Sequence, residues 1–120
     1  MEQLNAALNA AINAAINAQT VVLNAAINAQ TVAFNAALGN ERAFRRNIAR
    51  QNIMDDLEPI RSVVNPNVGN IHEYFPATVV DANALTNVQL NAMQAFYGTN
   101  FAGDNVAARR NNFLRFVKGL

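Results

Sequence analysis

The feature that most constrains this chain is an eleven-residue repeat within its first forty residues. Residues 16–26 read INAQTVVLNAA and residues 27–37 read INAQTVAFNAA, so the two blocks differ at only two positions. Looser copies of the LNAA or INAA unit extend back to Leu4. Eleven residues over three turns give about 3.67 residues per turn, a period that favours helices packed nearly straight or in a gentle right-handed coil. The repeat therefore predicts one long helix from Leu4 to Leu38.

The large side chains of this helix form one narrow stripe, which we call the seam, on a wheel of about 100° per residue. The seam consists of Ile12, Ile16, Thr20, Leu23, Ile27, Thr31, Phe34 and Leu38. A second stripe beside it, the amide column, consists of Asn13, Asn17, Asn24, Asn28 and Asn35. Alanines flank the seam on its other side, and two valines lie nearly opposite. We expect the seam and the amide column to form an oligomer interface with copies of the same chain. The alternative is a monomeric bundle in which the amide column faces water.

The composition also favours association. No side chain between Gln3 and Asn40 is charged, so no ion pairs support the helix. Charged residues make up 14% of the 120 residues, and the formal net charge is +1. A chain with few charges and a net charge near zero tends to associate, and it has no bulk attraction for nucleic acid or anionic membranes. The absence of cysteine excludes disulfides and thiolate metal sites.

The N-terminus lacks a basic segment, so we expect no secretory signal and a cytoplasmic location. Repeated asparagine disfavours a membrane span, because each amide would need a partner in hydrocarbon.

These signals predict an all-α chain in three parts. A long repeat helix occupies residues 1–57, with a possible break or hairpin at Gly39-Asn40 and an end at Glu58-Pro59, because proline disfavours helix in the residue before it. We expect continuity or a mild kink at the glycine. An extended connector follows over residues 58–84, and a helix–loop–helix module occupies residues 85–120.

The connector contains the turn signals Asn65-Pro66, Gly69-Asn70 and Phe75-Pro76. We expect it to lie along a surface or to cross to a neighbouring subunit. A short hairpin is the minor alternative, with residues 60–64 paired to residues 70–74. The expected apolar anchors are Ile60, Val63, Val64, Ile71, Tyr74 and Phe75.

A charged cluster follows the repeats. Its arginines are Arg42, Arg45, Arg46 and Arg50, and its acids are Asp55, Asp56 and Glu58. Arginine presents a planar fork of donors, so one interpretation is an anion-binding surface. The favoured interpretation is that these arginines pair with the acids, within one chain or between subunits. The acids could also hold a cation, although a solvated helix end is the simpler explanation.

In the C-terminal part, Thr86 followed by Gln89 predicts a capping box at the start of a helix that Gly98 ends. Asp104 or Asn105 is the expected cap of a last helix. Aromatic residues at helical spacing predict a small core, with base stacking as the alternative. They are Phe96, Tyr97, Phe101, Phe113 and Phe116.

The residues LTNVQLNAMQAFYG, a short loop, and NVAARRNNFLRFVKGL resemble the SAP-type helix–extended loop–helix pattern. That resemblance implies a DNA-binding or small docking module. The possible nucleic-acid contacts are Arg109, Arg110, Arg115 and Lys118. The stretch from Pro66 to Gly98 also resembles uncharacterised proteins of mushroom-forming fungi.

No pattern of an enzyme is present. His72 beside Glu73 is a weak general-base signal, because adjacent residues in an extended segment point to opposite faces. No set of residues has metal-ligand spacing, and no phosphate-binding, dinucleotide or nucleophile motif occurs, so no cofactor or small-molecule substrate is expected. The leading hypothesis is a structural protein that self-assembles through the seam into a bundle, tube or filament. The alternative is an oligomeric nucleic-acid-binding module that uses its basic last helix.

Overall fold

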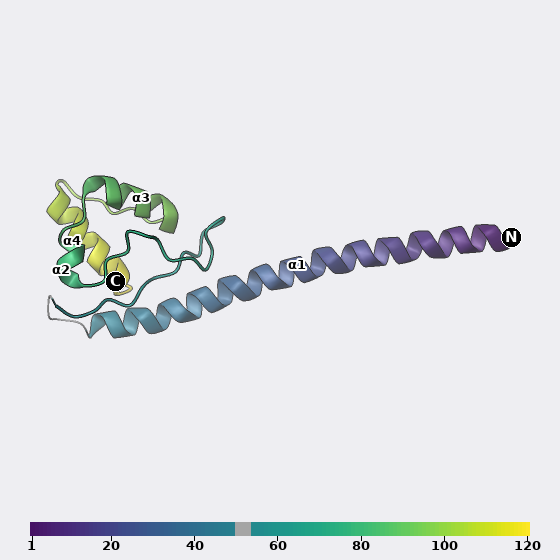
Figure 1. Cartoon of the computed structure of the whole chain (residues 1–120), viewed down its shortest axis with the longest axis horizontal. Helices are drawn as coiled ribbons and strands as arrows, with labels where there is room; N and C mark the ends of the chain where they lie inside the picture. The colour runs from purple at the N-terminus through teal and green to yellow at the C-terminus, as the bar shows by residue number, and fades with distance from the viewer. Residues whose placement is uncertain (50–53) are drawn as a thin grey trace. The chain divides into compact units, whose positions relative to one another are not determined.

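A computed structural model describes residues 1–49 and 54–120 (Figure 1). The described residues form helices α1 (Glu2–Ile48), α2 (Val79–Ala82), α3 (Asn87–Tyr97) and α4 (Val106–Val117), and no β-strand occurs among them. The prediction of an all-α chain with a long N-terminal helix is therefore confirmed.

The chain divides into two units, Met1–Val32 and Ala33–Leu120. The first unit is helix alone after Met1, and every residue in it is exposed. The second unit, which we call the module, contains the last part of α1 together with the connector and helices α2, α3 and α4.

Helix α1 continues through Gly39, so the expected continuity is confirmed. It ends at Ile48 and not at the predicted Leu57. Residues 54–58 are not helical, and the predicted residue Arg50 lies outside the described residues. The earlier end has a geometric reason. The Glu58 backbone is hydrogen-bonded to the Asn47 side chain, whereas eleven residues of uninterrupted helix would separate the two by about 16 Å.

One face of α1 packs against the rest of the module. Its buried residues are Ala36, Asn40, Ala43 and Asn47, at spacings of four, three and four residues. The alanines allow the connector backbone to approach the helix closely. On the wheel this face lies nearly opposite Phe34 and Leu38, which are 67% and 42% exposed. The module therefore covers the alanine side of α1 and packs on Phe44, whereas Phe34 and Leu38 stay largely exposed.

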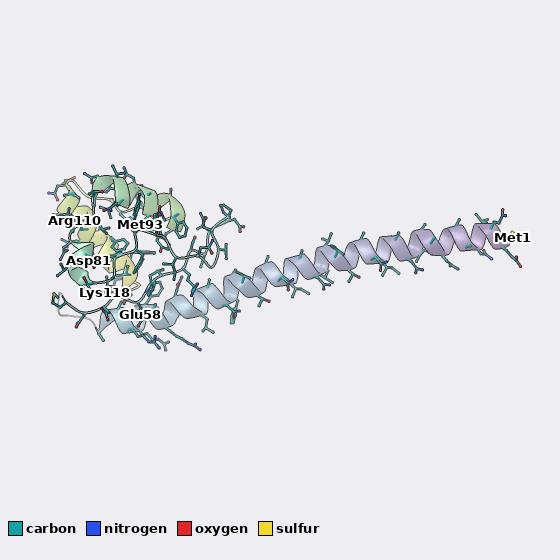
Figure 2. The ribbon with its side chains drawn as sticks, viewed as in Figure 1. Met1, Glu58, Asp81, Met93, Arg110 and Lys118 are labelled. Carbon is teal, nitrogen blue, oxygen red and sulfur yellow. The ribbon has the colours of Figure 1, made fainter. Side chains whose placement is uncertain are left out.

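Two asparagines of this face hold the connector, and we call the pair the asparagine clamp. Asn40 donates to the Arg61 carbonyl oxygen at 2.7 Å and accepts from the Arg61 N–H at 2.8 Å. Asn47 donates to the Glu58 carbonyl oxygen at 3.1 Å and accepts from the Glu58 N–H at 2.7 Å. Figure 2 labels Glu58 beside the last turns of α1. Seven residues of helix and three of extended chain both span about 10 Å, so the two spacings match.

The connector is folded back on itself. Backbone bridges join Asp56 to Thr78 and Arg61 to Ile71, both antiparallel. The second bridge lies within the predicted hairpin alternative, and a cis peptide bond before Pro66 lies in the turn. Of the expected anchors, Ile60 is fully buried and Phe75 is partly buried. The other four expected anchors are exposed: Val63, Val64, Ile71 and Tyr74.

The caps of the C-terminal helices follow the sequence signals. Thr86 and Gln89 form a capping box at α3, and Gly98 ends that helix in the left-handed conformation at φ 63°. Asn105 caps α4. The short helix α2, capped by Thr78, was not predicted and lies within the expected extended connector.

The module core is built from aromatic and aliphatic residues. The Phe101 ring lies 5.3 Å from that of Phe113 and 5.4 Å from that of Phe116, between centroids. Phe101 and Phe113 are fully buried and Tyr97 is nearly so, while Phe96 and Phe116 are partly buried against this cluster. The predicted aromatic core is thus confirmed. Phe101, Phe113 and Tyr97 are buried and closed to base stacking in this fold, whereas Phe96 and Phe116 are partly exposed.

Candidate interaction surface

The seam residues that lie in the first unit are all exposed. The large apolar members there are Ile12, Ile16, Leu23 and Ile27. Helical spacing places them on one stripe, and no residue of that unit is buried. A soluble helix normally buries such a stripe, because each large aliphatic side chain removed from water contributes about 1.5–3 kcal/mol.

Threonine is the polar member of the seam, and its hydroxyl is satisfied within the helix. The Thr20 hydroxyl donates to the Ile16 carbonyl oxygen at 2.9 Å, and the Thr31 hydroxyl donates to the Ile27 carbonyl oxygen at 2.9 Å. A satisfied hydroxyl removes most of the cost of burial. Both threonines can therefore enter an apolar contact without leaving an unpaired donor.

The amide column is exposed beside the seam. Asn17, Asn24, Asn28 and Asn35 are all exposed, and within residues 1–49 and 54–120 their side chains make no hydrogen bond. An asparagine carries two donors and an acceptor of two lone pairs. The donors and acceptors of the amide column are therefore open to hydrogen bonds with water or with a partner.

Among the described residues, one arginine of the predicted cluster lies in an ion pair with one of the acids. Arg46 lies 3.6 Å from Glu58, with both side chains at the surface. Such an exposed pair contributes little to stability. Arg42 and Arg45 are also exposed, and Asp56 is held by its backbone bridge to Thr78. The structure therefore provides one ion pair of the predicted kind within the described chain.

The predicted nucleic-acid contacts are divided between structural and exposed positions. Arg109 has a structural role, because all three nitrogens of its guanidinium donate within the module: to the Phe101 carbonyl at 2.8 Å, to Asn87 at 2.9 Å and to Asn91 at 2.7 Å. Arg110 donates to the Leu85 carbonyl at 2.7 Å. Arg115 is exposed and Lys118 is half-buried at the end of α4.

His72 has a structural environment. Its Nδ1 accepts from the Tyr74 N–H at 3.0 Å, and its ring packs edge-on against Phe96 at 4.9 Å. Its backbone N–H donates to the Tyr97 hydroxyl, which donates to the Ile60 carbonyl at 2.7 Å. Burial raises the pKa of Tyr97 to about 12, and the hydrogen bond from His72 opposes that shift. No group of three or more metal-ligating side chains occurs in the described part of the chain.

The asparagine clamp and Ser62 are the polar residues that the sequence analysis missed. Ser62 is fully buried and donates to the Phe96 carbonyl at 2.8 Å. Asn47 also donates to the Val117 carbonyl at 2.8 Å, so one amide joins α1, the connector and α4. A signal existed in the positions of Asn40 and Asn47, which lie twelve residues after Asn28 and Asn35, one more than the repeat of eleven.

No family model matches the chain, and neither a curated protein nor a solved structure matches it. By length and composition, α1 is one helix that could cross a membrane, with a mean hydropathy of 1.3 in its most apolar window. The core helix of a soluble protein, which is mostly buried, and a signal sequence near the N-terminus meet the same criteria, and this window of α1 is 0% buried.

Proposed function

We propose that this chain is a structural protein that self-assembles by packing the seam of α1 against the same helix of another copy. The observation that carries the proposal is the first unit, where every residue is exposed although an apolar stripe runs along the helix. A stripe of this kind at hendecad spacing fits the equivalent stripe of an identical helix. Copies of the chain would bury both stripes at once.

The module supports the same contact. In its part of α1, the connector covers the face of Ala43 and leaves Phe34 and Leu38 open. The seam is therefore free at this end of the helix for a partner of the same kind.

The test is a pair of substitutions in the seam, Ile16→Asp with Ile27→Asp. Two carboxylates in an apolar contact would have to be desolvated, so we expect loss of the assembly in sedimentation velocity and in negative-stain micrographs. The matched control is Ala18→Asp with Ala29→Asp, which places the same charges eleven residues apart on the alanine side. Sedimentation unchanged by the seam pair, or equal loss in both pairs, would contradict the proposal.

Nucleic-acid binding is the second candidate, supported by the exposed arginines Arg115, Arg42 and Arg45. It requires binding that weakens steeply with salt. Failure to retard either DNA or RNA at low salt would remove it.

The proposal also places the chain outside membranes, because the amide column would need hydrogen-bond partners in hydrocarbon. Flotation with liposomes tests this part of the proposal.

A further inference from the structure

We infer that the second copy runs antiparallel on the seam, centred at the level of Ala25. This inference rests on the proposed function and adds the direction and register of the contact. Two independent observations support it: the order of large residues along the seam, and the charges at the two ends of α1.

The seam is close to palindromic. Counted in residues from Ala25, three pairs of large seam residues lie at equal separations on its two sides. The pairs are Ile12 and Leu38, Ile16 and Phe34, and Leu23 and Ile27. In an antiparallel pair with this register, each of these large apolar residues therefore lies level with a large apolar residue of the other copy. Thr20 and Thr31 match to within one residue, and their hydroxyls are already bonded to their own helix. The contact is then isologous, with the same patch on both copies.

The charges at the two ends of α1 are complementary in the antiparallel arrangement. Arg45 lies eleven residues after Phe34, so it occupies the repeat position of Ile12, Leu23 and Phe34. In a parallel pair in register, Arg45 would lie beside the same residue of the partner and one turn from the Glu41 of that copy. In the antiparallel register Arg45 is level with Asn5, within about one turn of Glu2. The acid at one end of the helix thus meets the exposed arginine at the other, which is a complementary arrangement.

The module does not occupy the surface that this partner needs. The asparagine clamp holds the connector on the alanine side of α1, away from Phe34 and Leu38. A partner helix can therefore cover these two residues while the module remains folded as described.

Spin labels on single cysteines test the direction in the full chain, which contains no native cysteine. The two sites are Ala25→Cys and Ala11→Cys, both on the side away from the seam. In the antiparallel register the two Ala25 labels are level with each other, whereas the Ala11 labels are displaced along the axis by 28 residues, or about 42 Å. We expect pulsed electron paramagnetic resonance to give a much longer intermolecular distance for Ala11→Cys than for Ala25→Cys.

Equal distances at the two sites would overturn the antiparallel inference while leaving self-assembly intact, because a parallel pair in register keeps every label level with its partner. A longer distance for Ala25→Cys than for Ala11→Cys would also overturn it. No intermolecular distance, in samples that light scattering shows to be monomeric, would overturn both this inference and the proposed function. Light scattering of the unlabelled chain separates that outcome from an effect of the labels.

Discussion

Replacing Asn47 with alanine tests a buried set of three side-chain hydrogen bonds in the module. The side chain is 0% exposed and makes three hydrogen bonds, to the Val117 carbonyl and to both backbone groups of Glu58. Alanine leaves these groups unpaired in a buried place, at about 1 kcal/mol for each bond, and returns about 0.5 kcal/mol through its better helix propensity. We therefore expect a loss of about 2–4 kcal/mol in the free energy of unfolding, a large share of the stability of a small domain.

The assay is urea denaturation followed by tyrosine fluorescence, because Tyr97 is buried in the module core. The matched control is Asn111→Ala, which removes the same group from an exposed position of α4. We expect the control to stay within about 0.5 kcal/mol of the native chain. If Asn47→Ala behaves like the control, with the same midpoint and slope, the asparagine clamp does not hold the connector on α1.

Three further substitutions probe the module. Gly98→Ala should cost about 1–2 kcal/mol in the free energy of unfolding, because its φ is 63° and an added Cβ would lie 2.8 Å from a Val64 methyl; thermal melting that is unchanged would contradict this. Arg109→Ala should lower the free energy of unfolding by about 2 kcal/mol, because three hydrogen bonds are lost. Arg115→Ala, at an exposed position, should lower it little. Equal melting temperatures for the two variants would contradict this prediction. Tyr97→Phe tests the pH dependence. Because burial raises the phenol pKa from 10.0 to about 12, the native chain should lose about 2 kcal/mol of stability as the pH rises from 10 to 12. Phenylalanine has no proton to lose, so an equal loss for Tyr97→Phe in urea titrations would refute this account.

The parts of the fold that the sequence predicted are those where a local rule and the tertiary structure agree. The capping box of Thr86 and Gln89 and the left-handed Gly98 are each decided within a few residues. The aromatic core was predictable because rings at helical spacing bury a large apolar area. The continuity of α1 through Gly39 was also predictable, since one exposed glycine costs only about 1 kcal/mol relative to alanine in a long helix.

The end of α1 was not predictable by the same rules. Pro59 marks a residue that cannot lie within a helix, but it does not show how much earlier the helix stops. In the structure, α1 ends at Ile48, and Leu57 and Ile60 lie in the core with residues of α3 and α4. Such long-range burial leaves no local pattern before Pro59.

The asparagines of α1 show how one residue type takes two different roles in the same helix. Continuing the repeat by eleven residues from Asn28 and Asn35 would place asparagine at positions 39 and 46, where glycine and arginine stand. The asparagines occur one residue later, at Asn40 and Asn47, and one residue turns the side chain by about 100° around the helix. That rotation moves the amide from the exposed column to the alanine face, where both side chains are buried and bonded to the connector. The change of phase was visible in the sequence as a departure from the repeat. Its partners were not, because the clamp binds backbone groups, which every residue of the connector except proline carries in the same form.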